Sequence, residues 1–218
     1  MTSGTGLWGL AGTPWSPTLS EEMHMSLSDF YEIFFYGIWV LWSILWVVLA
    51  RNVKVTARRQ AALPRLLNMA LLVCAAAVLA APHLPVAGLE VRLLPGSQWK
   101  LWAALGAALT FLGLLFTVWA RITLGRNWSG VAAVKADHEL ITGGPYGWVR
   151  HPIYSGLALA FVGMAIAGGQ WRGVLSIALV LVAIVQRIVV EERFMRQQFG
   201  AVYTAYAQRV RAFVPGLV

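Results

Sequence analysis

Long apolar runs separated by short polar loops make up most of the chain. A helix needs about 20 apolar residues to cross the hydrocarbon core of a bilayer. Five runs approach that length, at residues 30–50, 66–89, 99–120, 153–168 and 174–190. We expect Pro82 and Pro85 to end the second helix early. The pattern predicts an all-α polytopic membrane protein with about five transmembrane helices.

The C-terminal end of the chain adds two further elements to this picture. The segment "GQWRG" (169–173) between the last two runs is too short for anything but a tight turn, which predicts a helical hairpin. Beyond the hairpin, apolar residues recur every three or four positions across 194–213, with Arg and Gln between them. This spacing predicts a C-terminal amphipathic helix on the membrane surface or over the bundle. We expect Gly200 to break or kink that helix.

The composition supports a membrane protein and excludes an ordinary soluble domain. Hydrophobic residues make up 59% and charged residues 12% of the 218 residues, whereas a soluble domain has about 25% charged residues. The single Cys74 permits no disulfide framework and is expected to be a small buried residue of its apolar run. The four His show no ligand spacing, so we expect no metal site.

The net charge of +8 is explained by topology signals rather than by nucleic-acid binding. Of the 17 Lys and Arg, five lie in 51–65, four in 121–152 and five after residue 186. The remaining three are Arg92, Lys100 and Arg172. The positive-inside rule then places the N-terminus outside and the C-terminus in the cytoplasm, together with the loop at 121–152. The basic loops would also contact anionic lipid of the bilayer.

The chain divides into three regions. Residues 1–28 are rich in Gly, Ser, Thr and Pro and lack Lys and Arg, which predicts a flexible N-terminus rather than a signal peptide. Residues 29–120 contain three predicted transmembrane helices. Residues 121–218 contain the last two helices and most of the candidate functional side chains.

The predicted hairpin brings polar residues from two distant stretches together. Antiparallel helices that turn near residue 170 pair positions whose numbers sum to about 341. Tyr154 then faces Arg187, and His151 lies beside Glu191. Ionisable groups in or near a membrane are functional candidates. The pairing predicts a polar site at the cytoplasmic end of the hairpin.

The start of the fourth helix adds to this site. Pro152 suits the first helical turn, with His151 at or near the N-cap. The four unpaired N–H groups of a helix start would form an anion site.

Each of these residues also has a purely structural interpretation. Arg187 could extend its guanidinium to the membrane interface, and Glu192 could pair with Arg196 one helical turn on. His151 could be a simple helix cap, and the tyrosines could belong to an interfacial aromatic belt. Their convergence on one face of the hairpin favours a functional site.

Two stretches of the C-terminal half stand out: "GRNWSGVAAVKADHELITGGPYGWVRHPIYSG" (125–156) and "QRIVVEERFMRQQFGAVYTAYAQRVRAFVPGL" (186–217). Together they resemble the C-terminal half of the isoprenylcysteine carboxyl methyltransferase family, whose wider group includes membrane phospholipid N-methyltransferases. The resemblance implies a methyltransferase that uses S-adenosyl-L-methionine (SAM) and releases S-adenosyl-L-homocysteine. It implies that Arg187 is the catalytic residue and binds the carboxylate of the substrate. By matched position, it assigns cofactor binding to His138, Glu139, Leu140, Ile141, Tyr146, His151, Pro152, Ile153, Tyr154 and Glu191.

The expected substrate is an isoprenylcysteine-like or other lipophilic molecule, methylated on a carboxyl oxygen. Phospholipid N-methylation and thiol S-methylation are alternatives within the same chemistry. An NADPH-dependent membrane reductase is a further alternative, because the C-terminal half of sterol reductases also resembles this family. A small transporter or sensor would be non-enzymatic, but transport sites lie near the midplane and these residues cluster at one end. The sequence leaves the methyl acceptor and the oligomeric state open.

Overall fold

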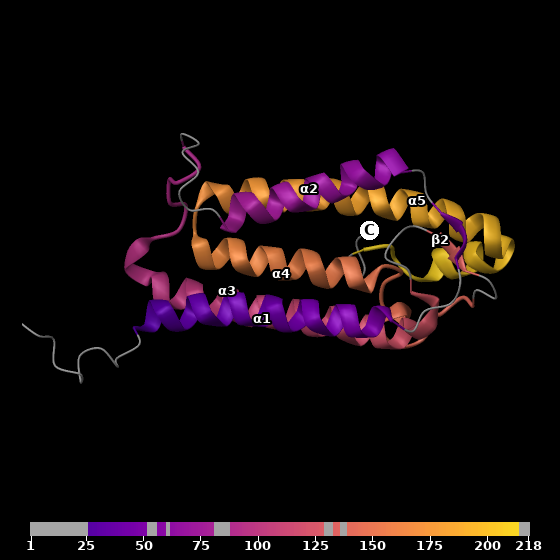
Figure 1. The fold of residues 1–218 in the computed structure, drawn as a ribbon, viewed down its shortest axis with the longest axis horizontal. Coiled ribbons are helices and arrows are strands. Elements are labelled where there is room, and N and C mark those ends of the chain that lie inside the picture. Colours follow the sequence, from indigo (N-terminus) through magenta and orange to yellow (C-terminus); the bar gives the residue numbers. More distant parts are fainter. Residues whose placement is uncertain are drawn as a thin grey trace, which may run out of the picture.

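The computed structural model describes residues 26–51, 56–59, 62–80, 88–128, 133–135 and 139–213. Five helices form an elongated bundle (Figure 1), in which α4 lies between the pair α1 and α3 and the pair α2 and α5. They are α1 (Leu27–Ala50), α2 (Ala62–Ala80), α3 (Trp99–Leu124), α4 (Pro152–Gly168) and α5 (Trp171–Arg209). The all-α prediction is confirmed. The sequence did not predict the small antiparallel pair of β1 (Thr56–Arg59) and β2 (Ala133–Lys135).

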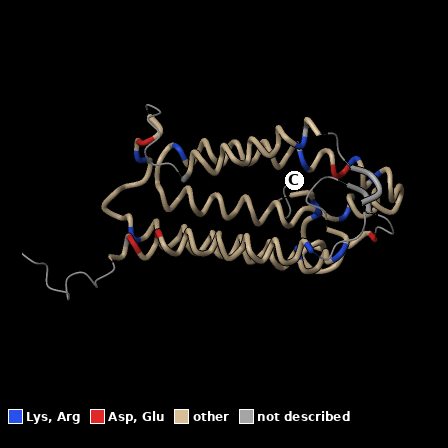
Figure 2. Tube along the Cα trace, viewed as in Figure 1, with Lys and Arg blue, Asp and Glu red and all other residues tan. Residues whose placement is uncertain are grey.

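Each of the five helices overlaps one of the five apolar runs, although α2 ends at Ala80 and α5 continues to Arg209. Within the described residues, three are long and apolar enough to cross a membrane: Asp29–Ala50, Gly96–Asn127 and Trp171–Arg209. The apolar parts of the other two are shorter, at Arg65–Leu79 and Pro152–Gly168. Figure 2 shows Lys, Arg, Asp and Glu gathered at the two ends of the bundle. The chain is therefore a polytopic membrane protein, and the crossing of all five helices stays a prediction.

Helices α3 and α4 pack at backbone contact. Gly106 and Gly113 of α3 face Gly163 and Gly156 of α4, and each glycine lies seven residues from its helical partner. A Cβ at Gly156 would lie only 2.5 Å from the Gly113 carbonyl oxygen, so no larger residue fits without a shift of one helix. Such small-residue contacts are the usual way for membrane helices to approach closely.

The hairpin between α4 and α5 turns at Gly169, which adopts a left-handed conformation with φ 61°. Its carbonyl oxygen accepts the Leu93 N–H at 2.8 Å, and the Trp171 N–H donates to Val91 at 3.2 Å. The turn is thus tied to the segment that precedes α3, and the predicted tight hairpin is confirmed. Pro82 and Pro85 lie outside the described residues, although α2 does end at Ala80.

The C-terminal helix differs from the prediction in one respect. It does not begin as a separate helix near residue 194, because α5 runs without interruption from Trp171 to a kink at Gly200, with φ 50° and ψ −122°. The predicted kink at Gly200 is therefore confirmed. Beyond it the chain folds back on the loop before α4, where Arg150 N–H donates to Arg211 at 2.8 Å and His151 N–H to Ala212 at 3.0 Å.

Candidate active site

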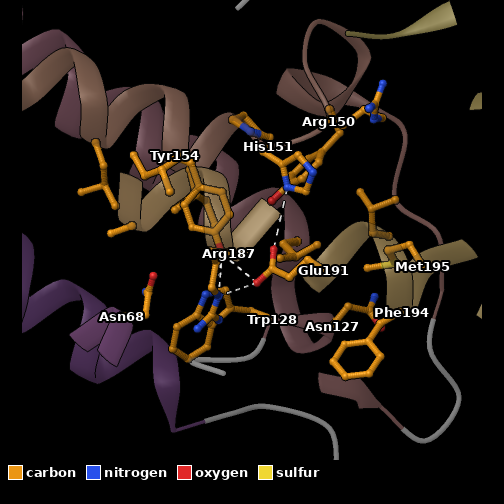
Figure 3. Close-up of a pocket in the computed structure, with 18 of the residues that line it drawn as sticks. Asn68, Asn127, Trp128, Arg150, His151, Tyr154, Arg187, Glu191, Phe194 and Met195 are labelled. Atoms are coloured by element: carbon orange, nitrogen blue, oxygen red, sulfur yellow. Dashed lines mark hydrogen bonds and ion pairs between the residues drawn. The ribbon is translucent and has the colours of Figure 1, made fainter. Parts of the chain in front are cut away.

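A cavity of about 290 Å³ opens between the helices near the residues that precede α4. Its walls come from α1, α2, α4 and α5 and from the segments 124–128 and 139–151. Figure 3 shows the polar side chains of α4 and α5 pointing into it. The bundle therefore contains a pocket large enough for a small molecule, with one charged end.

Tyr154, Arg187 and Glu191 form a hydrogen-bonded cluster at the charged end. Arg187 Nε donates to the Tyr154 hydroxyl at 3.0 Å and to Glu191 Oε1 at 2.8 Å. The Tyr154 hydroxyl in turn donates to Glu191 Oε1 at 2.7 Å. Within the described residues, Nη1 and Nη2 of Arg187 make no hydrogen bond. The guanidinium is thus held by one nitrogen while its outer edge remains available.

His151 lies above this cluster and connects it to a second carboxylate. Its ring stacks on the Tyr154 ring at 5.8 Å, and Nδ1 lies 3.8 Å from Glu191 Oε2. Nε2 lies 3.5 Å from Glu192 Oε1, at a geometry that makes no hydrogen bond, although the nitrogen is buried. The convergence of His151 on Glu191 that the hairpin pairing predicts is confirmed.

Glu192 anchors the loop before α4 to α5. Its Oε1 accepts Arg150 Nε at 2.9 Å together with the Nη2 nitrogen of the same guanidinium. Its Oε2 accepts Arg196 Nη2 at 2.6 Å, as the spacing on the helix predicts. Arg150 also donates from Nη1 to the Ala207 carbonyl at 3.1 Å. Glu192 therefore stabilises the chain around the cavity, and Arg150 is its main partner.

The C-terminal segment after the kink at Gly200 also contributes to the cavity lining, through Tyr203 and Tyr206. The Tyr206 hydroxyl donates to the Tyr146 carbonyl oxygen at 2.6 Å, and Ser155 Oγ donates to the Phe213 carbonyl at 2.5 Å. Tyr146 is buried, and burial raises the pKa of its hydroxyl far above the ordinary range. Tyr146 is therefore a neutral, buried residue of the cavity lining.

Aromatic and aliphatic side chains form a further part of the cavity wall. Trp42 and Trp46 of α1 stack at 4.5 Å, and Trp46 meets Trp128 edge to face at 5.8 Å. Trp42 Nε1 donates to Thr117 Oγ1 at 2.6 Å, which fixes the ring against α3. Phe161 of α4 and Leu72 of α2 extend this wall deeper into the bundle. The cavity is thus polar at one end and apolar along its length.

The predicted site residues lie together with one exception. The following line the cavity: Glu139, Leu140, Ile141, Tyr146, His151, Pro152, Ile153, Tyr154, Arg187 and Glu191. His138 lies outside the described residues. The roles assigned to these residues in cofactor and substrate binding stay predictions.

The start of α4 differs from the predicted anion site. Pro152 occupies its first turn and His151 its N-cap position, as expected, but the His151 side chain makes no capping bond. The N–H groups of Tyr154 and Ser155 both donate to the His151 carbonyl oxygen, and Pro152 has no N–H. The expectation of four free donors is therefore wrong.

Sequence reasoning missed several residues of the cavity wall. Arg150 and the α1 residues Trp42 and Trp46 line the cavity but are not among the site residues that the sequence predicts. Asn68 of α2 is buried inside an apolar run, which is a signal that could have found it. Cys74, expected to be buried, is exposed on the same helix.

Comparisons with known proteins find similar sequences. A family model described as phospholipid methyltransferase matches residues 101–202. Protein-S-isoprenylcysteine O-methyltransferase B of Arabidopsis thaliana is 32% identical over 130 residues, which are 58% of this chain and 66% of the relative. A probable protein-S-isoprenylcysteine O-methyltransferase of Oryza sativa subsp. indica is 34% identical over 113 residues, 50% of this chain and 59% of the relative. The alignments thus span less than two thirds of these relatives.

A solved structure of the eukaryotic intramembrane Ras methyltransferase ICMT (isoprenylcysteine carboxyl methyltransferase), determined without a monobody, is also similar. It aligns with a TM-score of 0.47 at 24% identity, over 68% of this chain and 52% of that chain.

The apolar bundle is that of an integral membrane protein, and the cavity with its charged side chains lies among its helices. The matched region, residues 101–202, contains α4, the Arg187–Glu191 cluster and most of the polar cavity lining. The chain is therefore similar to phospholipid methyltransferases over residues 101–202 and to protein-S-isoprenylcysteine O-methyltransferases over about half of its length.

Proposed function

We propose that the protein is a SAM-dependent methyltransferase that esterifies the carboxylate of a lipophilic acceptor such as an isoprenylcysteine. The observation that carries the proposal is the hydrogen bonding of the Arg187 guanidinium. Its Nε is held by Tyr154 and Glu191, while Nη1 and Nη2 make no hydrogen bond within the described residues. Those two nitrogens form the fork that binds a carboxylate through two parallel hydrogen bonds.

The residues present fit SAM as the methyl donor. The Glu191 carboxylate can accept hydrogen bonds from hydroxyl or ammonium groups, and its negative charge favours a cationic ligand. Tyr154 and His151 present stacked rings for a planar base. When bound, SAM supplies a methyl group on a cationic sulfur. We assign cofactor binding to the segment 139–141 and to Tyr146, His151–Tyr154 and Glu191, with His138 proposed on the resemblance alone.

The chemistry requires positioning rather than proton transfer. A carboxylate oxygen of the acceptor would form a bond to the methyl carbon as the carbon–sulfur bond breaks, and the electron pair would remain on the sulfur. The acceptor is already an anion, so no general base is needed. Arg187 would hold the acceptor carboxylate for this attack, and the apolar wall would keep water away from the attacking oxygen.

The apolar length of the cavity supports a lipid-like acceptor. Trp42, Trp46 and Phe161 line the same cavity as Arg187. An acceptor with its chain along the aromatic wall would place its carboxylate at the guanidinium. The curated relatives are named isoprenylcysteine O-methyltransferases, which supports a lipid-modified acceptor.

We also propose that the N-terminus is outside and the C-terminus and the site face the cytoplasm, because 14 of the 17 Lys and Arg lie in the segments at that end. In a Cys74→Ser background, a cysteine at Thr142 should resist a membrane-impermeant maleimide in intact cells, and one at Glu90 should react. The reverse pattern would contradict the proposed orientation.

The function is tested with purified protein, tritiated SAM and a panel of acceptors. S-farnesyl-N-acetylcysteine, phosphatidylethanolamine and a small thiol represent the three methyl-acceptor classes. We expect base-labile label, typical of a methyl ester, on the prenylcysteine. Label on the lipid amine or on the thiol would overturn the carboxyl assignment, and failure to bind SAM would overturn the methyltransferase assignment.

A further inference from the structure

Asn68 is a polar side chain that the proposed reaction does not yet use. It lies in α2, which contributes a wall of the cavity but lies outside the segment matched by the family model. The residue is 8% exposed, and its carboxamide oxygen has no hydrogen-bond partner within the described part of the chain. A buried polar group without a partner is costly, and such groups in membrane helices commonly mark a binding function.

The position of Asn68 relates it to the proposed acceptor site. Figure 3 shows Asn68 on α2 among the residues that line the cavity, and Tyr154 and Arg187 line the same cavity. Met69 and Leu72, which line the same cavity, are apolar. Asn68 therefore places a hydrogen-bonding group within an otherwise apolar part of the wall, on the side of the cavity formed by α2.

We propose that Asn68 is a specificity-determining residue that recognises a hydrogen-bond donor next to the methylated carboxylate. This inference rests on the proposed function. The unpartnered atom is an acceptor oxygen, so its complement is an N–H or O–H group on the ligand. In an acylated amino acid, an amide N–H is attached to the carbon that bears the carboxylate. The favoured substrate class is therefore an N-acylated, S-alkylated cysteine rather than a simple lipophilic acid.

The geometry divides recognition between two residues. Arg187 binds the carboxylate and Asn68 binds the neighbouring amide, while the aromatic wall holds the alkyl chain. A site built to accept a hydrogen bond rejects an analogue that lacks the donor, because its own polar atom is then left unpaired. Asn68 thus selects among acceptors that Arg187 alone would bind equally.

The test compares two acceptors that differ by a single group. S-farnesyl-N-acetylcysteine carries the amide, whereas S-farnesyl-3-mercaptopropionate has the same chain and carboxylate without it. We expect the unmodified protein to favour the amide acceptor by about tenfold in kcat/KM, the effect of one neutral hydrogen bond. In Asn68→Leu the ratio between the acceptors should fall close to one. An unchanged ratio in the variant would overturn the inference.

The melting temperature of Asn68→Leu gives a second test, because the two possible roles of Asn68 predict shifts in opposite directions. If Asn68 serves recognition, Asn68→Leu removes an unpaired buried amide and should raise the melting temperature in detergent. If Asn68 instead stabilises the fold, the variant should melt earlier and keep its acceptor preference. Leu67→Ala is the matched control, because Leu67 is exposed on the same helix and does not line the cavity. Its acceptor ratio should equal that of the unmodified protein.

Binding measurements separate this inference from the proposed function. Trp42 and Trp46 line the cavity, so acceptor binding should change the tryptophan fluorescence without any turnover. A protein that methylates neither acceptor would refute the proposed function. In that case a tighter dissociation constant for the amide acceptor, lost in Asn68→Leu, would still support recognition by Asn68. Equal binding of both acceptors by the unmodified protein would refute it.

Discussion

Arg187 Nε lies 2.8 Å from Glu191 Oε1, one helical turn further along α5. Pairs in this order, with the cation on the N-terminal side, are the weaker arrangement on an isolated helix. The Tyr154 hydroxyl joins both side chains, so the pair here is stabilised by tertiary contacts from α4. The groups proposed to hold the two substrates therefore belong to one connected cluster.

The first prediction concerns the guanidinium. Arg187→Lys keeps the positive charge but loses the planar fork, so it should lower kcat by about a hundredfold or more. SAM affinity should change little, because Glu191 remains in place. Radiolabel transfer and calorimetry measure the two quantities separately. A fully active Arg187→Lys would show that the arginine serves only to anchor the helix at the interface.

The second prediction concerns the neighbouring carboxylate. Glu191→Gln removes a charged acceptor at the proposed cofactor site, a contact that contributes about 1.5–3 kcal/mol. We expect the dissociation constant for SAM to rise about ten- to hundredfold. Calorimetric titration checks this value. Equal loss of SAM binding in Glu191→Gln and Arg187→Lys would contradict the division of roles between the two residues.

The third prediction concerns Glu192, whose role we expect to be stability of the fold rather than the cofactor binding proposed for Glu191. Glu192→Gln leaves the Arg150 guanidinium, with only 10% of its side chain exposed, without its anionic partner. Breaking a buried pair costs about 3–5 kcal/mol, and we expect the lower end because Arg150 keeps the carbonyl acceptors of Ala207 and Val210. Urea titration in mild detergent measures the loss.

The control for this change is Arg196→Gln. The Arg196 side chain is 56% exposed, and an exposed ion pair contributes about 1 kcal/mol or less. The control should therefore unfold almost as the unmodified protein does. If both variants lost the same stability, the buried Arg150 contact would not be the main role of Glu192.

Much of the site could be predicted because the hairpin between α4 and α5 is short. A tight turn fixes the register of two apolar helices, and the pairing of Tyr154 with Arg187 follows from numbering alone. The side chain of Glu191 reaches the same place because it lies one turn from Arg187. A short turn and a spacing of one helical turn are local constraints, and both can be predicted from the sequence.

The remainder depends on contacts that no local pattern specifies. The contribution of Tyr206 to the cavity lining requires the chain to reverse at Gly200 and bring Tyr206 back to Tyr146. A glycine predicts a kink but not its direction. The walls from α1 and α2 depend on how distant helices pack, so Trp42 and Asn68 could be placed in apolar runs but not in the cavity.

The fourth prediction tests that reversal. Gly200 has φ 50°, which a residue with a Cβ adopts only with strain, although a Cβ there would meet no atom within 4 Å. Gly200→Ala should therefore cost about 1 kcal/mol or more through the backbone alone. Gly37→Ala is the control, because Gly37 also has open space but lies within α1, where alanine is favoured. Melting temperatures should fall for Gly200→Ala and hold or rise for Gly37→Ala.

The last prediction concerns the contact of α3 with α4. A Cβ at Gly156 would lie 2.5 Å from the Gly113 carbonyl oxygen and 2.7 Å from Thr117 Cγ2. Gly156→Ala must therefore push the two helices apart, and overpacking of this kind costs about 1–3 kcal/mol. Gly168→Ala, at the end of the same helix, meets no atom within 4 Å and should retain full stability.

Gly156→Ala should also change the geometry of the candidate active site. Gly156 lies two residues after Tyr154, and Thr117 receives the hydrogen bond of Trp42 on the cavity wall. A shift of the first turns of α4 would move the Tyr154 hydroxyl away from Arg187, which it now contacts at 3.0 Å. We expect Gly156→Ala to raise the KM for the acceptor as well as lower the melting temperature. A variant that melted earlier but kept its acceptor KM would show that the glycine contact supports the bundle without setting the position of Tyr154.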